Sequence, residues 1–165
     1  MKKSVIIFTL LFMIIPFKSF TQELKEQTKT QIKPALLIID IQNVYLPMVP
    51  EREKEVAMYY INGLIQLFRS NGYPIIRIYH LDRESGPKPD SEQFEFPNSV
   101  LIRDEDAKVI KTYGNGFTKT DLDKIIKEKG SNTLFLCGLS AVGCVLSTWI
   151  GAQDHDYKAF MVKNA

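Results

Sequence analysis

The stretch ALLIID, residues 35–40, decides the fold class of this chain. Its five consecutive apolar residues are typical of a strand that is buried on both faces of a parallel sheet. The residue that follows such a strand lies at the carboxyl edge of the sheet, where ligands bind in open α/β folds. Asp40, which closes the run, is therefore the first candidate for a functional side chain.

Four more short apolar runs predict the other strands, and amphipathic segments separate most of them. The predicted strands cover residues 35–40, 73–80, 108–112, 133–137 and 158–162. Strands that alternate with helices are typical of an α/β domain with a parallel sheet. We therefore expect a doubly wound, Rossmann-like parallel sheet flanked by helices in three layers, within one domain over residues 34–165.

Three segments are predicted to be helical. Residues 51–70 carry apolar side chains at helical spacing, and residues 144–153 follow the fourth strand after a turn. Between them, Thr120 and Asp123 resemble a capping box with aspartate in place of glutamate, and they open a helix. The apolar positions are Val56, Tyr59, Tyr60, Gly63, Leu64, Leu67 and Phe68 in the first helix, and Leu122, Ile125 and Ile126, which are expected to face inward, in the second.

Functional side chains are expected along one rim of this sheet. Asp40, His80 and the turn after Cys137 all fall at predicted strand ends. The rim is extended by residues 82–99, whose glycine, prolines and charges predict a long loop. Long loops in compact domains are often functional.

The first 21 residues, MKKSVIIFTLLFMIIPFKSFT, have the layout of a secretory signal peptide. A basic start is followed by an apolar run over residues 5–17 and a short polar stretch. We expect cleavage near Thr21 and Gln22 and export to the periplasm or the medium. The alternative is an uncleaved N-terminal membrane anchor, although the run is shorter than the roughly 20 residues that span a bilayer. Residues 22–33 are polar and would form a tether.

The composition fits one ordinary globular core. Of the 165 residues, 45% are hydrophobic and 24% are charged, with a formal net charge of +2. This profile excludes a disordered, collagen-like or disulfide-dense chain. Removing residues 1–21 takes away three lysines and no acid, so the remainder carries −1. Without a basic stripe or a second long apolar segment, we expect no nucleic-acid partner and no membrane association after cleavage.

The turn GLSAVGC, residues 138–144, does not fit two familiar motifs. A G-x-S-x-G nucleophile elbow needs glycine where Val142 stands. A phosphate-binding loop needs lysine and then serine or threonine where Cys144 and Val145 stand. What remains is a cysteine at a helix start, where the helix dipole lowers the thiol pKa and favours a nucleophile. The alternative is that Cys144 is a small apolar helix residue.

Cys137 ends an apolar strand and is expected to be a buried structural thiol. A disulfide with Cys144 is the competing interpretation, because such bonds form in oxidising compartments. In that case the chain would be a redox-active thiol protein.

Three blocks of the sequence together resemble the isochorismatase-like cysteine hydrolase superfamily, which includes nicotinamidases, N-carbamoylsarcosine amidases and isochorismatases. The blocks are ALLIIDIQN (35–43), KTYGNGFTKTDLD (111–123) and GLSAVGCVLSTWIGAQDHDYKAFMVKNA (138–165). The resemblance implies a catalytic triad of Asp40, Lys111 and Cys144. It also implies an oxyanion hole formed by the backbone N–H groups of Ser140 and Cys144.

The same resemblance implies a non-proline cis peptide between Leu139 and Ser140, and a substrate pocket shaped by Gln42, Phe117 and Leu139. The implied reaction is hydrolysis of a C–N bond in a small carboxamide or ureido substrate, through a thioester on the cysteine. A thiol, a carboxylate and an ammonium group suffice for this chemistry, so no cofactor is expected. Family members are commonly oligomers, so we expect a homo-oligomer.

Two departures from the family pattern limit these expectations. Nicotinamidases hold a metal with an Asp-x-His motif and a further histidine, whereas the strand end here reads YHLDRES (79–85). We expect no catalytic metal, although His80 and Asp82 offer ligand atoms. Family members also continue past the position of Ala165 into a final helix, which we expect this fold to lack. The rival function is a catalytically silent remnant that serves as a binding or assembly module.

Overall fold

The computed structural model describes residues 31–165, so the predicted signal peptide and most of the predicted tether lie outside the described residues. The described part contains one five-stranded sheet in the order β3-β2-β1-β4-β5, with every neighbouring pair parallel. The strands are β1 (Pro34–Ile39), β2 (Ile75–His80), β3 (Ala107–Lys111), β4 (Thr133–Gly138) and β5 (Lys158–Met161). The predicted parallel α/β sheet is confirmed.

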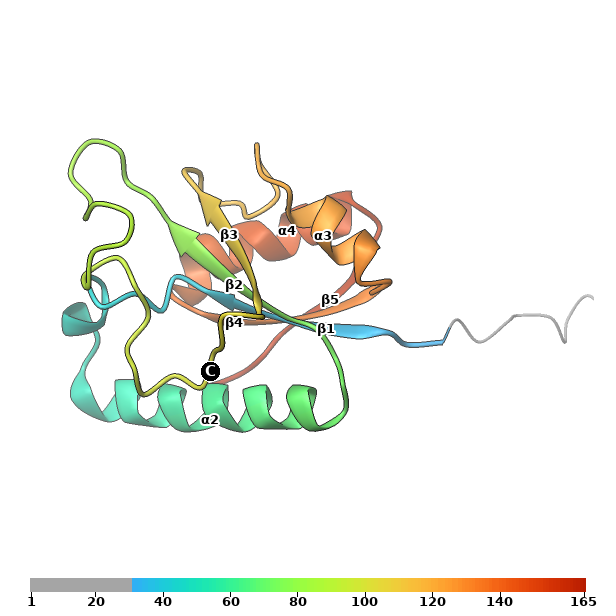
Figure 1. Cartoon of the computed structure of the whole chain (residues 1–165), viewed down its shortest axis with the longest axis horizontal. Helices are drawn as coiled ribbons and strands as arrows, with labels where there is room; N and C mark the ends of the chain where they lie inside the picture. Colours follow the sequence, from blue (N-terminus) through green and yellow to red (C-terminus); the bar gives the residue numbers. More distant parts are fainter. Residues whose placement is uncertain (1–30) are drawn as a thin grey trace, which may run out of the picture. The chain divides into compact units, whose positions relative to one another are not determined.

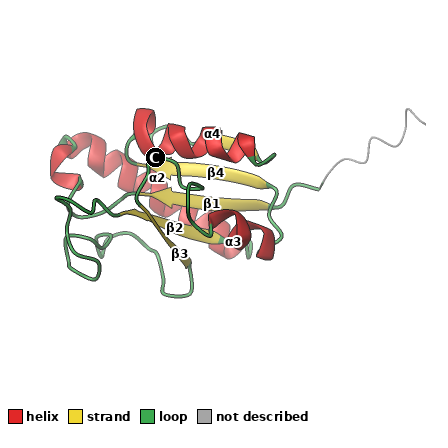
Figure 2. Ribbon diagram, turned by 90° about the horizontal axis from the view of Figure 1, so that it is seen from above, coloured by secondary structure: helices red, strands yellow, loops and turns green. Residues whose placement is uncertain are grey.

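Helices cover both faces of the sheet (Figure 1; Figure 2). Helix α2 (Glu51–Ser70) lies on one face, and α3 (Leu122–Glu128) and α4 (Leu146–Asp154) lie on the other. Two short helical turns precede α2 and α4: η1 (Leu46–Met48) ends two residues before α2, and η2 (Ala141–Val145) leads directly into α4.

The central strand β1 serves two cores at once. Successive side chains of a strand point to opposite faces, so its residues divide between the two helical layers. Leu36 and Ile38 belong to the core on the α2 side, whereas Leu37 and Ile39 belong to the core with α3 and α4. Every residue of β1 is therefore buried, as the uninterrupted apolar run predicted.

Helix α2 has the predicted bounds, but a different side of it is buried. The buried residues are Ile61, Ile65 and Phe68, at the spacing of one helical face. Most of the apolar positions that indicated the helix lie off this face. The exposed ones are Val56, Tyr59, Tyr60, Gly63 and Leu67. The sequence pattern therefore identified the helix correctly without identifying its inward face.

The predicted capping box at α3 does not form. The helix begins after Asp121, whose own side chain makes no capping hydrogen bond. The Asp123 carboxylate instead accepts the Tyr157 hydroxyl at 2.8 Å and the Lys127 ammonium at 2.6 Å. Thr120 Oγ1 does accept the Leu122 N–H at 3.2 Å, so half of the motif contributes. Because Lys127 and Tyr157 bond the Asp123 carboxylate, it is not available to complete the capping box.

The predicted long loop is firmly attached to the domain. Residues 81–106 connect β2 to β3 without a helix or a strand. Within this segment, Phe94 and Phe96 are buried and pack on the ring of Tyr79, at centroid distances of 5.4 and 4.4 Å. The loop thus adds an aromatic layer to the core on the α2 side, and its first residues remain at the carboxyl edge of the sheet.

The last described residues run from β5 toward α2 (Figure 1). The Val162 N–H donates to the Leu136 carbonyl, and the Gly138 N–H donates to the Ala165 carbonyl. No helix follows β5 within residues 31–165. Among the described residues, no helix is both long enough and apolar enough to cross a membrane.

Candidate active site

Three neighbouring strands deliver the first group of functional side chains to one edge of the sheet. Asp40 directly follows β1, while His80 and Lys111 are the last residues of β2 and β3. His80 and Lys111 are also register partners across the β2–β3 pair. Parallel strands have their carboxyl ends at the same edge, which is why residues so far apart in sequence meet here.

Asp40 and Lys111 form a buried ion pair. Lys111 Nζ lies 2.8 Å from Asp40 Oδ2, and the two residues are only 1% and 3% exposed, respectively. Burial raises the pKa of the Asp40 carboxyl above its ordinary value, and the Lys111 ammonium opposes that shift. The other oxygen, Oδ1, is buried without a hydrogen-bond partner among the described residues. Asp40 therefore keeps one oxygen available as a proton acceptor.

Lys111 also contacts His80. Its Nζ lies 3.2 Å from His80 Nδ1, and because an ammonium group can only donate, Nδ1 must be the acceptor. The imidazole is then neutral and carries its proton on Nε2. Burial and the Lys111 charge both lower the pKa of His80, which favours this neutral form. The lysine thus bridges a carboxylate and an imidazole.

Cys144 reaches the same place from β4 through a tight turn. Gly138, at the end of β4, has a φ of +123°, and a Cβ there would lie 2.0 Å from the Ile39 carbonyl oxygen. Only glycine fits this close approach between β4 and β1. The peptide between Leu139 and Ser140 is cis, as the resemblance implied.

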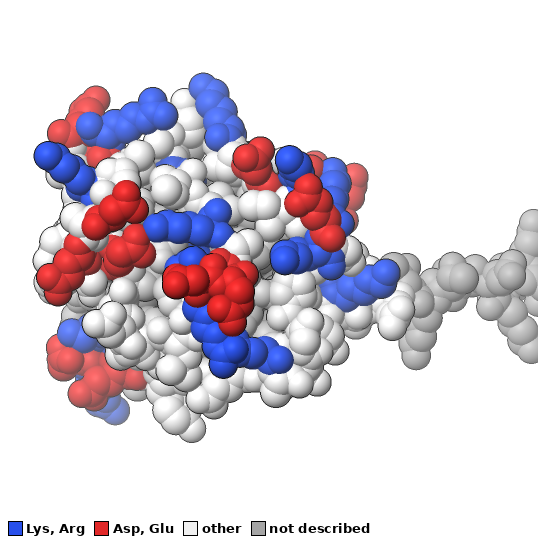
Figure 3. Space-filling model, in the orientation of Figure 1, with Lys and Arg blue, Asp and Glu red and all other residues white. Residues whose placement is uncertain are grey.

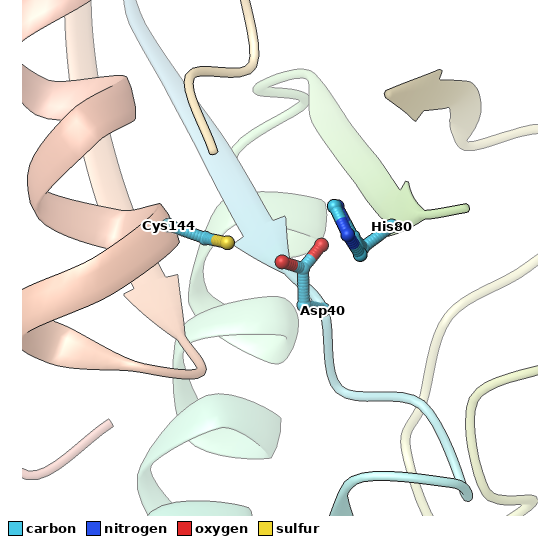
Figure 4. Close-up of side chains that lie close together, drawn as sticks. All are labelled: Asp40, His80 and Cys144. Atoms are coloured by element: carbon cyan, nitrogen blue, oxygen red, sulfur yellow. The ribbon is translucent and has the colours of Figure 1, made fainter. Parts of the chain in front are cut away.

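The helix start differs from the expected one. Cys144 lies inside η2, a π-helical turn that contains non-helical angles at Gly143, and the regular helix α4 begins two residues later. In Figure 4, Asp40 lies between Cys144 and His80, and the ligand atoms of the three side chains are all within 4.8 Å of one another.

The expected lowering of the Cys144 pKa is not what this environment produces. Burial raises the thiol pKa, and the nearby Asp40 carboxylate raises it further, while Lys111 acts in the opposite direction. The resting group is therefore a thiol facing a carboxylate. A nucleophile of this kind is activated by transfer of its proton to the adjacent base.

A cavity of about 500 Å³ opens onto these side chains. Five residues that the sequence singled out line it besides Asp40, namely His80, Asp82, Leu139, Ser140 and Cys144. The sequence reasoning missed three lining residues that come from the segment between β1 and α2, which are Tyr45, Met48 and Val49. The run VYLPMV, residues 44–49, could have predicted this lining, because so many apolar side chains are unusual in a connection at the sheet edge.

The other two predicted pocket residues lie outside this cavity lining. Gln42 is fully buried, and its side-chain amide bonds the backbone of His80: Oε1 accepts the His80 N–H at 2.7 Å, and Nε2 donates to the His80 carbonyl at 3.1 Å. Phe117 is buried and stacks on His155 at a centroid distance of 4.6 Å. Gln42 thus acts on the site through His80.

The two cysteines have separate environments. Cys137 is 1% exposed, its thiol donates to the Leu37 carbonyl, and burial raises its pKa to about 12. Both cysteines are free thiols, so the structure contains no disulfide between them. The structural role predicted for Cys137 fits this position, and the redox pair does not.

Comparison with known proteins agrees with the fold. Residues 34–165 match the Isochorismatase domain family. The uncharacterized isochorismatase family protein YddQ from Bacillus subtilis is 30% identical over 136 residues, which cover 79% of this chain and 76% of that protein. This chain belongs to the isochorismatase family.

Solved structures of the isochorismatase family show the same fold. An isochorismatase from Pseudomonas putida is 27% identical, with a TM-score of 0.73 over 81% of this chain and 70% of that one. The N-carbamoylsarcosine amidase from Thermoplasma acidophilum has a TM-score of 0.74 over 81% of this chain and 83% of that one. Its identity is 24%, so it supports the fold alone.

The metal site that the resemblance attributes to nicotinamidases does not fit these residues. The whole chain has two histidines, and His155 bonds the Gly151 carbonyl and stacks on Phe117 instead of facing the cavity. Asp40, His80 and Cys144 offer oxygen, nitrogen and sulfur atoms close together, but Lys111 already bonds the first two. A cation there would meet the ammonium charge at close range.

Proposed function

We propose that this isochorismatase-family protein is a cysteine hydrolase that cleaves the C–N bond of a small carboxamide or ureido substrate. The observation that carries the proposal is the meeting of a thiol, a carboxylate and a buried ammonium in one cavity. Cys144 and Asp40 line the cavity, and Lys111 holds Asp40 from behind at 2.8 Å. These are the groups that nucleophilic acyl transfer at a thiol requires.

In the first half-reaction, Asp40 takes the Cys144 proton and the thiolate attacks the substrate carbonyl. The tetrahedral intermediate collapses to a thioester as the C–N bond breaks, and Asp40 returns its proton to the leaving nitrogen. The raised pKa of Asp40 suits both roles, because a group that titrates closer to neutral pH accepts and donates protons more readily.

In the second half-reaction, Asp40 accepts a proton from water, and the hydroxide attacks the thioester. The acid product leaves, and the proton returns to the Cys144 sulfur, so the enzyme is restored. We propose that the backbone N–H groups of Ser140 and Cys144 bind the oxyanion in both halves. Such donors typically contribute about 3 kcal/mol each to transition-state stabilisation.

The test combines a substrate panel with trapping of the intermediate. The purified protein is incubated with small primary amides and ureas, and ammonia release is measured for wild type, Cys144→Ala and Asp40→Asn. We expect turnover by wild type, none by Cys144→Ala, and an acyl adduct on Cys144 by intact mass after a rapid acid quench. Cys137→Ala is the matched control and should retain turnover.

The competing function, a silent binding or assembly module, makes the opposite prediction. No amide or urea would be hydrolysed, and iodoacetamide would label Cys144 at the same rate in wild type and Asp40→Asn. That pair of results would replace the hydrolase proposal.

We also propose that the chain is exported and cleaved near Thr21 and Gln22. Mass spectrometry of the mature protein tests this directly. An N-terminus at or near Gln22 supports export with cleavage, and retention of residues 1–21 in a membrane fraction would indicate the anchor instead.

A further inference from the structure

The charged side chains that line the active-site cavity are all acidic. Its lining contains two carboxylates, Asp40 and Asp82, and no lysine or arginine among the described residues. Lys111 stands behind the lining, 1% exposed, and its charge is matched by Asp40 at 2.8 Å. The charge left uncompensated at the cavity is therefore that of Asp82.

Asp82 is held in place and remains ionised. Its Oδ1 accepts the Glu84 and Ser85 N–H groups at 2.9 and 3.3 Å, and its Oδ2 accepts the Ser85 hydroxyl at 2.5 Å. These hydrogen bonds lower the pKa of Asp82. Because this loop begins directly after β2, the carboxylate keeps a defined position beside the cavity.

The remaining polar groups of the lining are neutral. His80 accepts a hydrogen bond from Lys111 and is therefore uncharged. The pKa of Tyr45 is raised by burial and by the Asp40 and Asp82 charges, so its phenol keeps its proton. The Tyr45 ring lies against His80 at a centroid distance of 6.5 Å, and an aromatic ring of this kind attracts a cation at its face.

From these charges we infer that the cavity selects substrates that are uncharged or cationic beside the scissile group and rejects substrates that carry a carboxylate there. Asp82 is the residue that sets this preference. This inference rests on the proposed function, because a preference among substrates presupposes that the protein is a hydrolase. It can still be tested without turnover, because the charge preference acts on any reagent that reaches Cys144.

The preference for uncharged or cationic molecules comes from groups in the cavity and not from the wider surface. On the face drawn in Figure 3, acidic and basic side chains are interspersed, and neither sign covers that face. Long-range steering over this face is therefore weak, and the preference should depend on groups within about a Debye length of the bound molecule, roughly 10 Å at 0.1 M salt.

The first experiment uses methanethiosulfonate reagents of different charge. The trimethylammonium-ethyl, methyl and sulfonato-ethyl forms all transfer their thioalkyl group to a thiolate, forming a disulfide and releasing methanesulfinate. Rates at Cys144 are measured by intact mass in the full chain and divided by the rates with 2-mercaptoethanol. We expect the cationic form to react about tenfold faster than the anionic form after this correction, and the ratio to fall as salt rises.

Two variants assign the preference to a residue. Asp82→Asn should reduce the cation-to-anion ratio at least about threefold. Asp104→Asn is the matched control, since it removes the same charge from the same loop at a fully exposed position and should leave the ratio unchanged. A ratio near one in wild type, or a ratio that Asp82→Asn does not alter, would overturn the inference.

The second experiment uses substrates of matched length. Pentanamide, 4-aminobutanamide and succinamate present a methyl, an ammonium and a carboxylate group at the far end of a primary amide. We expect kcat/KM for succinamate to be the lowest by about tenfold. Failure of all three to react would count against the proposed function, while the reagent ratios at Cys144 would still decide the charge preference.

Discussion

The side-chain amide of Gln42 makes a ring of two hydrogen bonds with the backbone of His80. Oε1 accepts the His80 N–H at 2.7 Å, and Nε2 donates to the His80 carbonyl at 3.1 Å. Gln42 is fully buried and lies two residues after Asp40, so this ring ties the end of β1 to the end of β2. It fixes the spacing between the two residues that hold Lys111.

Removing this ring should destabilise the fold. Gln42→Ala leaves a buried donor and a buried acceptor without partners, at about 1–3 kcal/mol each. We expect urea denaturation to show a loss of roughly 2–6 kcal/mol in unfolding free energy. Asn43→Ala, whose side chain bonds the exposed Glu92 carbonyl, is the neighbouring control and should cost less. Equal losses for the two variants would contradict the role given to Gln42.

The buried pair of Asp40 and Lys111 should show strong coupling. Lys111→Met leaves an unpaired buried carboxylate, which typically costs about 3–5 kcal/mol, or shifts its pKa upward until it is neutral. The double variant Asp40→Asn with Lys111→Met removes both charges and should recover most of that stability. Additive losses measured by denaturation would contradict the pairing. Activity should be absent in both variants.

His80 gives the protein a pH dependence of predictable sign. Its pKa is lowered from 6.5 by burial first and by Lys111 second. The unfolded chain therefore binds the proton more tightly than the folded one, so this contribution to stability is complete above pH 6.5 and is lost as pH falls through the folded pKa.

The matched variant for this pH dependence is His80→Gln, whose amide oxygen can still accept from Lys111 and does not titrate. We expect its unfolding free energy to fall less than that of wild type between pH 7 and pH 5, as measured by urea denaturation at each pH. Parallel curves for the two proteins would show that His80 makes no such contribution.

Gly138 should tolerate no side chain. A Cβ there would lie 2.0 Å from the Ile39 carbonyl oxygen, and its φ is +123°. Gly138→Ala is expected to displace the turn that carries Cys144, with loss of activity and a lowered melting temperature. Gly63→Ala is the control: nothing lies within 4 Å of its Cβ position in α2, so it should stabilise the helix by about 0.5–1 kcal/mol. A fully active Gly138→Ala protein would refute this reading of the turn.

Thiol labelling should distinguish the two cysteines. Iodoacetamide is expected to modify Cys144 alone in the folded protein, because Cys137 is 1% exposed with a pKa of about 12. Asp40→Asn removes a charge that raises the Cys144 pKa, so this variant should be alkylated faster at pH 8 than wild type. Rates and stoichiometry come from intact mass, with two modified thiols expected in urea. Slower labelling of the variant would contradict the stated influence of Asp40.

The sequence alone determined much of this protein. The run at residues 35–40 predicted a doubly buried central strand, and β1 is buried at every position. Parallel strand ends predicted one rim for Asp40, His80 and the turn after β4, and these residues do line one cavity. Such features follow from local periodicity and from the geometry of parallel sheets, both of which can be read along the chain.

The tertiary structure alone decided the side-chain partners and the charge states. The inward face of α2, the bond from Lys111 to His80, and the position of Gln42 outside the cavity all depend on contacts between distant segments. The sequence context of Cys144 indicated a lowered pKa from the helix start, whereas burial and the Asp40 carboxylate raise it. Desolvation and charge pairing depend on what surrounds a group in space, and a linear pattern does not contain that information.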